Sequence, residues 1–231
     1  DKGFDVEFMH CSSDNSSLDG IAVPGVGVAV IDGTAPHVVD PRYPGATDEI
    51  INLGEFWNEE GITGHRKEIS EISDEIKRIF AGGYRYLMAA RHLYEDSAEI
   101  NGRFMDKSRI NTLTREIIDD IWPGVPYARK AGRQRCLFAS AITPDGLKDY
   151  LDDILITDNI IILEGFPGAG TEDLLERVKN AAVERGFDTE CYYCAFIPEK
   201  LEHLVIPELK ISFTTSNRYH STDACPIRKI N

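Results

Sequence analysis

The 231-residue sequence predicts an α/β fold: a three-layer parallel sheet, internally duplicated, with an inserted helical hairpin. Three observations predict it. An uninterrupted apolar run at 160–163 precedes a glycine-rich turn and a helix start. Residues 3–11 match residues 186–194 without a gap, at a shift of 183 positions. Between these copies, apolar residues recur at the spacing of amphipathic helices.

Composition limits the classes of function. A net charge of −14 opposes binding to nucleic acid or to an anionic membrane, so neither partner is expected. No apolar run approaches the roughly 20 residues of a membrane span, and a cytoplasmic location is expected. Five cysteines predict free thiols rather than a disulfide framework. Cys191 and Cys194 would face opposite sides of one strand, which argues against a metal ion held by both.

The first copy, residues 1–45, begins where the second copy has the end of a helix. We therefore expect about 20 to 30 residues upstream, enough for a strand, a loop and a helix. An apolar strand at 26–31 ends in Asp32. An acid at this point is typical of the carboxylate that holds Mg²⁺ beside a nucleotide. It is also typical of a turn residue.

Further polar residues accompany Asp32 in the first copy. The loop at 11–17, with Ser12 and Ser13, would follow a strand at the carboxyl edge of the sheet, where ligands bind in open α/β folds. The alternative is a solvated turn. Thr34 and His37 follow Asp32, and a hydroxyl-bearing loop with a final histidine recurs at 215–220. A shared histidine is more often a packing or capping residue than a catalyst, and both roles remain open.

Residues 46–128 form the predicted helical insertion. Apolar spacing predicts one helix over 66–100, weakened or kinked at Gly82-Gly83, and a second over 106–122. The two helices are expected to close an antiparallel hairpin. Its expected role is to cover the sheet, and a moving lid is the alternative.

Residues 129–157 link the copies. The segment 129–135 holds the basic cluster of this acidic chain, with Arg133 and Arg135, and it predicts either an arginine for a phosphate or a solvated loop. A strand over 136–143, a turn and a short helix over 147–154 follow.

The second copy, residues 158–231, has predicted strands at 160–163, 188–195 and 209–214 and a helix at 172–185. This order is typical of a parallel βαβ sheet. The strand at 209–214 is expected to be an exposed edge, where a dimer would form.

The glycine loop of the second copy has the spacing of a phosphate-binding loop. Its glycines allow backbone amides to turn toward an anion at the start of a helix. The full pattern requires Lys and Ser/Thr after the last glycine, but Thr171 and Glu172 occupy those positions. Glu172 and Asp173 favour the helix and oppose an anion. We therefore expect this loop to be empty at low phosphate, and a purely connecting role is the alternative.

Five segments together resemble an uncharacterised bacterial family of tandem P-loop ATPase-like proteins: 10–20, 31–37, 48–54, 137–144 and 202–208. The resemblance covers nearly the whole chain. It implies a P-loop NTPase fold, a lysine-bearing loop in the first copy, and a second copy that can be degenerate. It implies no substrate or pathway.

The leading functional hypothesis is an ATP-binding protein, a candidate ATP hydrolase, whose competent site is in the first copy and whose cofactors are ATP and Mg²⁺. The chain as given lacks a complete site and is expected to show little ATPase activity. Asp32 would hold Mg²⁺ and act with His37 in catalysis. The expected nucleotide-binding residues are Ser12, Ser13, Thr34, Gly165, Gly168, Gly170 and Thr171. The alternative is a non-catalytic pseudo-NTPase scaffold that binds a protein partner or a second copy of itself.

Overall fold

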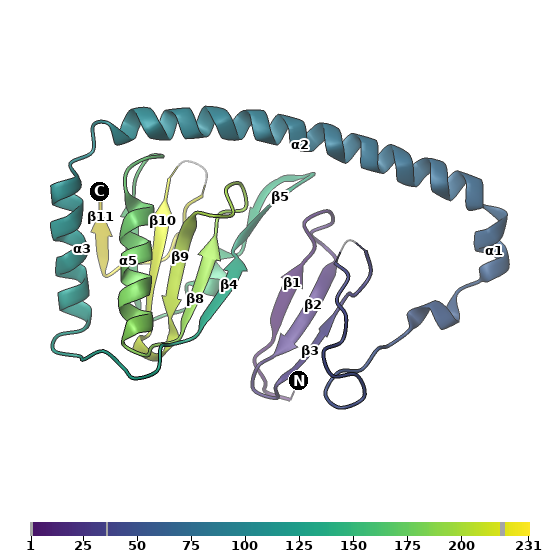
Figure 1. The fold of residues 1–231 in the computed structure, drawn as a ribbon, viewed down its shortest axis with the longest axis horizontal. Coiled ribbons are helices and arrows are strands. Elements are labelled where there is room, and N and C mark those ends of the chain that lie inside the picture. The colour runs from purple at the N-terminus through teal and green to yellow at the C-terminus, as the bar shows by residue number, and fades with distance from the viewer. Residues whose placement is uncertain (1, 36, 218–219) are drawn as a thin grey trace. The chain divides into compact units, whose positions relative to one another are not determined.

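The computed structural model describes residues 2–35, 37–217 and 220–231. The chain divides into two compact units, Asp1–Arg85 and Tyr86–Asn231. Both contain β-sheet and helix, so the protein is mixed α/β (Figure 1). The division falls inside helix α2 (Arg66–Gly102), so each unit contains part of that helix.

A six-stranded sheet with the order β11-β7-β10-β9-β8-β4 forms the centre of the second unit. Its strands are β4 (Gln134–Phe138), β7 (Asn159–Glu164), β8 (Thr189–Tyr193), β9 (Leu201–Ile206), β10 (Ile211–Ser216) and β11 (Arg228–Ile230). Pairing is parallel for β11–β7, β7–β10 and β4–β8, and antiparallel for β10–β9 and β9–β8. The sheet is therefore mixed rather than all-parallel.

The parallel prediction was wrong in the middle of the sheet because strand β9 was not foreseen. Only residues 194–200 connect β8 to β9, and strands joined by so short a connection pair in antiparallel fashion. As a result β10 lies between β7 and β9. The predicted exposed edge at 209–214 was also wrong, since the edge strands of this sheet are β11 and β4.

Strand β7 is buried on both faces, as its apolar run predicts. Ile161 and Leu163 belong to a core shared with helices α3 (Lys107–Ile121) and α5 (Thr171–Glu184). Ile160 and Ile162 belong to a second core around α4 (Leu151–Ile154). Successive side chains of a strand point to opposite faces, so one apolar run serves both cores.

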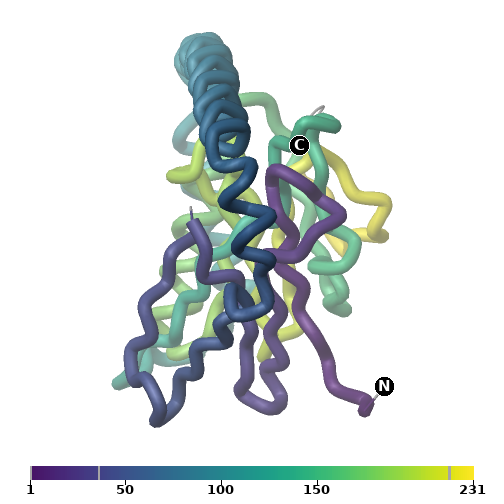
Figure 2. The backbone as a smooth tube through the Cα atoms, turned by 90° about the vertical axis from the view of Figure 1, so that its right-hand side faces the viewer, coloured from purple at the N-terminus to yellow at the C-terminus, as the bar shows by residue number. Residues whose placement is uncertain are grey.

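The predicted helical hairpin does not form. Helix α3 packs against α5, and α2 and α3 meet at a corner instead of lying side by side (Figure 1). The apolar face of α3, with Leu113, Ile117 and Ile121, is covered by the core of the second unit. Helix α2 continues without a break through Gly82-Gly83. Figure 2 shows this helix end-on. A helical glycine costs only about 1 kcal/mol relative to alanine, which does not end a long helix.

The segment after β4 is a small hairpin of β5 (Ser140–Thr143) and β6 (Gly146–Asp149). The strand predicted at 136–143 is therefore two strands, and the first part of the helix predicted at 147–154 is β6. Gly146 has φ +99°, a conformation that suits glycine and lets the chain reverse after the turn.

The first unit contains an antiparallel sheet of β1 (Glu7–His10), β2 (Leu18–Val23) and β3 (Val28–Ile31), followed by a 3₁₀ turn (Leu53–Phe56) and α1 (Glu59–Gly64). The apolar strand predicted at 26–31 exists as β3. All four residues of β3 are exposed in the structure, whereas the central residues of β10, the corresponding strand of the second unit, are buried.

The sheet of the first unit and β8-β9-β10 of the second share one pairing scheme at the 183-residue shift. Phe8 faces Ile21, as Cys191 faces Leu204 at the shifted positions. Ile21 in turn faces Val30, and Leu204 faces Phe213 at the shifted positions of the second unit. The agreement extends the sequence match to strand register.

Candidate functional site

The glycine loop joins β7 to α5 and packs against α2 in the second unit. Gly168 and Gly170 have φ of +84° and +77°, which glycine adopts without a steric penalty. A Cβ at Gly168 would lie 2.1 Å from the carbonyl oxygen of Ala98. The side-chain amide of Asn101 donates a 2.9 Å hydrogen bond to the carbonyl of Pro167. These contacts fix the loop against the helix.

A pocket of about 160 Å³ lies at this loop. The predicted loop residues Gly165, Gly168, Gly170 and Thr171 all line it. Its other lining residues are Tyr94, Phe166, Pro167, Glu172, Asp173, Lys200, Thr215 and Asn217. The structure therefore brings the loop, the first turn of α5 and the end of β10 together.

Lys200 is a pocket residue that the sequence did not predict. Its ammonium donates a 2.8 Å hydrogen bond to the Tyr94 hydroxyl and lies 3.5 Å from Oε1 of Glu202. Burial lowers the pKa of Lys200, but the hydrogen bond to Tyr94 and the nearby negative charge outweigh it and raise the pKa overall. No motif could have indicated this residue, because Lys200 precedes β9 and lies near the loop only as a result of how the strands pair in the sheet.

Two acids line the same pocket, as the sequence predicts. Glu172 and Asp173 stand in the first turn of α5. Burial of its carboxyl group raises the pKa of Glu172 and outweighs the charge of Lys200, which lowers it. The residue as a whole still reaches solvent. The pocket thus combines one lysine with two carboxyl groups.

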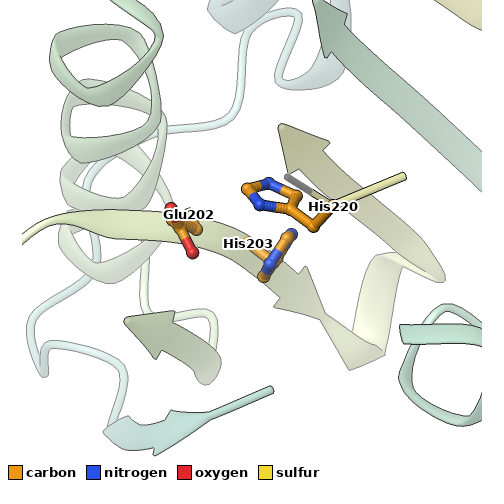
Figure 3. A group of neighbouring side chains, drawn as sticks. All are labelled: Glu202, His203 and His220. Atoms are coloured by element: carbon orange, nitrogen blue, oxygen red, sulfur yellow. The ribbon is translucent and has the colours of Figure 1, made fainter. Parts of the chain in front are cut away.

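A second group of polar side chains lies beside the pocket. Glu202 and His203 come from β9, and His220 follows β10 (Figure 3). Their potential ligand atoms all lie within 4.8 Å of one another. The two imidazole rings meet edge to face, with centroids 5.3 Å apart.

A β-bulge explains why neighbouring residues of one strand share this group. Tyr192 faces His203 and Tyr193 faces Leu201, so Glu202 is an additional residue in β9. A bulge re-aims a side chain that would otherwise point to the opposite face. The carboxylate of Glu202 therefore approaches the ring of His203.

Hydroxyl groups orient both histidines. Nδ1 of His203 lies 2.7 Å from Oγ1 of Thr214, and Nε2 of His220 lies 2.9 Å from Oγ1 of Thr215. Burial lowers the pKa of both histidines, most strongly for the fully enclosed His203. Both rings are therefore neutral near pH 7. His220 is the repeated histidine of the sequence, whereas no motif indicated Glu202 or His203.

The predicted residues of the first unit lie at one edge of its sheet. Strands β1 and β3 are both antiparallel to β2, so their carboxyl ends share an edge. Ser12 and Ser13 follow β1 and are exposed, and Asp32 follows β3. The structure thus places these predicted residues at one edge of the first unit's sheet, whereas the glycine loop is part of the second unit.

Asp32 itself forms a local turn. Its carboxylate accepts hydrogen bonds from the backbone amide and the hydroxyl of Thr34, at 2.9 and 2.7 Å. The hydrogen bond from the backbone amide is the main cause of the lowered pKa of Asp32. His37 lies 3.6 Å from the carboxylate of Asp19. The described residues exclude Pro36, and also Arg218 and Tyr219 of the corresponding loop at 215–220. This geometry favours a turn role for Asp32 and is compatible with the predicted metal role.

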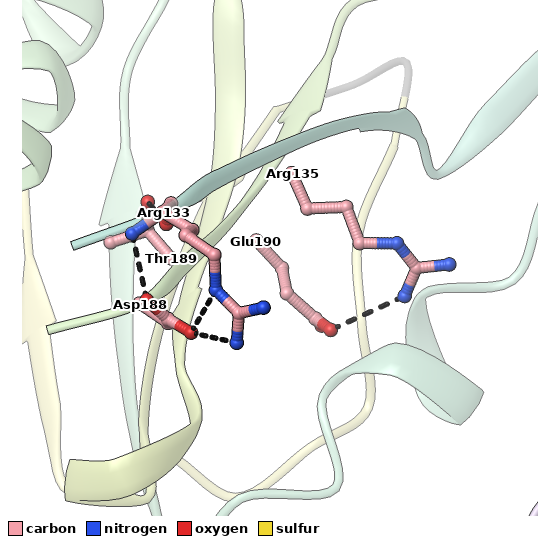
Figure 4. A network of polar contacts seen from close by, with 5 residues as sticks. All are labelled: Arg133, Arg135, Asp188, Thr189 and Glu190. Atoms are coloured by element: carbon pink, nitrogen blue, oxygen red, sulfur yellow. Dashed lines mark hydrogen bonds and ion pairs between the residues drawn. The ribbon is translucent and has the colours of Figure 1, made fainter. Parts of the chain in front are cut away.

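The basic cluster binds acids of the chain itself. Arg133 donates through its backbone amide and its guanidinium to Asp188, and Nη1 of Arg135 lies 3.5 Å from Glu190 (Figure 4). These ion pairs connect the start of β4 to β8. The Arg133 side chain is 85% exposed, so these observations favour the solvated-loop alternative over an arginine that serves a phosphate.

No family model matches the chain, and no curated protein or solved structure matches it either. The class that the structure defines is therefore a mixed α/β protein with a glycine-loop pocket. Among the described residues, no helix has the length and apolar character needed to cross a membrane. All five cysteines are free thiols, as predicted.

Proposed function

We propose that this chain is a duplicated nucleotide-binding protein of the P-loop NTPase type, and that the glycine-loop pocket of its second unit binds the phosphates of ATP. The single observation that carries the proposal is the position of Lys200. Its ammonium lines the pocket together with Gly168 and Gly170. A lysine from outside the motif thus stands near the loop where Thr171 has replaced the motif lysine.

The chemistry of the pocket suits a phosphate group. Backbone amides at a helix start offer several hydrogen bonds, and the helix dipole favours negative charge there. Lys200 adds a charge-assisted donor, which is among the stronger hydrogen bonds available to a phosphate. Its present partners, Tyr94 and Glu202, hold the ammonium beside the loop.

The size of the pocket limits what it holds. Its volume of about 160 Å³ lies below the roughly 300–1,000 Å³ of a typical small-molecule pocket. That space suits phosphate groups rather than a whole nucleotide. The ribose and base would extend into solvent, and discrimination between bases should be weak.

The first unit carries the proposed Mg²⁺ and hydrolysis functions. At the 183-residue shift the counterpart of Asp32 is Thr215, which lines the glycine-loop pocket. The shared strand register supports this correspondence. In a unit with its own loop, Asp32 would therefore face the phosphates, where a carboxylate can hold Mg²⁺. His37 would lie nearby as the counterpart of His220.

Calorimetric titration with ATP, with and without Mg²⁺, tests the proposal. Lys200→Met should weaken binding at least tenfold, because a hydrogen bond to a charged group contributes about 1.5–3 kcal/mol. Glu172→Gln should strengthen binding severalfold by removing a like charge. Lys210→Met is the matched control, since Lys210 is exposed and pairs with Asp158. Equal ATP affinity of wild type and Lys200→Met would contradict the proposed phosphate site in the second unit.

The role of Asp32 is tested by the same titrations on a chain extended upstream to include the loop expected in the first copy. Asp32→Ala should reduce only the part of ATP binding that requires Mg²⁺. The second-unit pocket should bind without Mg²⁺, because Glu172 stands where the metal-binding hydroxyl of the motif belongs. Mg²⁺-dependent binding that survives Asp32→Ala would contradict the role of Asp32.

An interaction scaffold is the second candidate, and one observation favours it. Ile69, Ile72, Ile76 and Ile79 follow a three-four spacing along α2 and are 45–59% exposed. This spacing is the seam of a coiled coil, and a second copy of the helix presents the identical seam. The proposed partner of this face is therefore another copy of the chain.

A further inference from the structure

We propose that Glu202, His203 and His220 form a binding site for a divalent transition metal of the Zn²⁺ type. The site adjoins the phosphate pocket but takes none of its three ligands from the residues that line it, and neither proposal depends on the other. A carboxylate with two imidazoles is a ligand set that zinc uses in proteins, with water in the fourth position. The three residues come from β9 and from the segment after β10.

The geometry allows one ion to contact all three side chains. Zinc bonds to nitrogen and oxygen measure about 2.0–2.2 Å, so tetrahedral ligand atoms lie about 3.3–3.6 Å apart. The present ligand atoms lie within 4.8 Å of one another. Small side-chain rotations would bring them to bonding distance without moving the strands.

The surrounding hydroxyls select the ring nitrogens. Metal-bound histidines use one nitrogen for the ion and the other for a partner that fixes the ring. Thr214 binds Nδ1 of His203 and thereby leaves Nε2 for an ion. Thr215 binds Nε2 of His220 and leaves Nδ1. Both hydroxyls come from β10, which holds the two rings in a defined relation.

The carboxylate completes the set. The bulge in β9 aims Glu202 toward the rings and supplies a negative charge to offset that of the ion. Lys200 approaches Oε1 of Glu202 at 3.5 Å and competes with a cation. Affinity should therefore fall below that of a site whose carboxylate has no ammonium neighbour.

The first unit provides an internal comparison. At the 183-residue shift the positions of Glu202, His203 and His220 are Asp19, Gly20 and His37. The first unit has the same bulge at Asp19, and the ring of His37 lies 3.6 Å from that carboxylate. Gly20 supplies no ligand. The first unit thus has two of the three ligands and should bind the ion only weakly.

Zinc titration of the purified chain against a chromophoric chelator tests the site. We expect one Zn²⁺ per chain, with a Kd below about 1 µM. His220→Ala and Glu202→Gln should each weaken binding at least a hundredfold. His37→Ala, the matched change in the first unit, should leave zinc binding at the second-unit site unchanged. Added Zn²⁺ should raise the Tm of wild type and not that of His220→Ala.

Folding and thiol binding need their own variants. His220 is only half-buried, so its alanine variant keeps the fold more readily than a change at His203, and circular dichroism verifies it. Cys194→Ser should retain zinc. Absence of stoichiometric zinc, equal losses in His37→Ala and His220→Ala, or loss in Cys194→Ser with retention in His220→Ala would each overturn the proposal.

Discussion

The ammonium of Lys200 lies 2.8 Å from the hydroxyl of Tyr94, and this hydrogen bond joins the segment before β9 to helix α2 beside the glycine loop. The Lys200 side chain is only 12% exposed. A long cationic side chain in so enclosed a position requires partners, and Tyr94 and Glu202 provide them. The same contact directs the positive charge into the pocket.

Tyr94→Phe should destabilise the protein by about 1–2 kcal/mol, because it removes a hydrogen bond to a charged and largely buried group. The Tm should fall by roughly 2–8 °C for a chain of this size. Thermal unfolding followed by circular dichroism measures the change. Tyr86→Phe is the control, since Tyr86 is 82% exposed on the same helix. Equal stability of the two variants would mean that Tyr94 does not hold Lys200.

Gly168→Ala should destabilise the second unit by about 2 kcal/mol or more, through the positive φ and the collision with the carbonyl of Ala98. Gly124→Ala is the matched control. Gly124 has φ +71° but nothing within 4 Å of an added Cβ, so only the backbone penalty of about 1–2 kcal/mol applies. Urea unfolding compares them. A smaller loss at Gly168 would show that the loop does not pack on α2.

Glu176→Gln should lower the free energy of unfolding by about 1–2 kcal/mol at neutral pH, since it removes the anionic partner of Lys179, whose side chain is 9% exposed. Burial lowers the pKa of Lys179, but its hydrogen bond and charge interaction with Glu176 outweigh this and raise the pKa above the usual 10.5. The pair therefore stabilises fully below pH 10.5 and less as pH rises beyond it.

Urea unfolding from pH 7 to 11 checks this dependence. The difference between wild type and Glu176→Gln should stay constant to about pH 10 and then shrink. Glu184→Gln, an exposed change at the end of the same helix, serves as the control. A difference that grows with pH would contradict the assigned pair.

Self-association through α2 is the prediction of the scaffold hypothesis. Wild type should form oligomers at micromolar concentration in sedimentation analysis. The double change Ile72→Glu and Ile76→Glu should abolish them by placing charge in the apolar seam. Ser70→Glu, outside the seam on the same helix, should leave them intact. A monomeric wild type would dismiss this function.

The sequence alone determined the elements whose signals are local. The apolar run of β7 predicted a strand buried on both faces, and α2, α3 and α5 were predicted within two residues at each end. The start of α5 after Gly170 and the acids at 172–173 were also predicted. Side-chain period, glycine turns and first-turn acids act over a few residues, so the sequence records them directly.

Only the tertiary structure decided which strands pair and which side chains meet. β9 lies between β8 and β10, which reversed the expected strand directions and buried the strand expected at the edge. The same arrangement brings Lys200 to the glycine loop, and Glu202 and His203 to His220. Strand order and register depend on contacts between distant segments, and a single extra residue in β9 re-aims a side chain. No local pattern in the sequence encodes those relations.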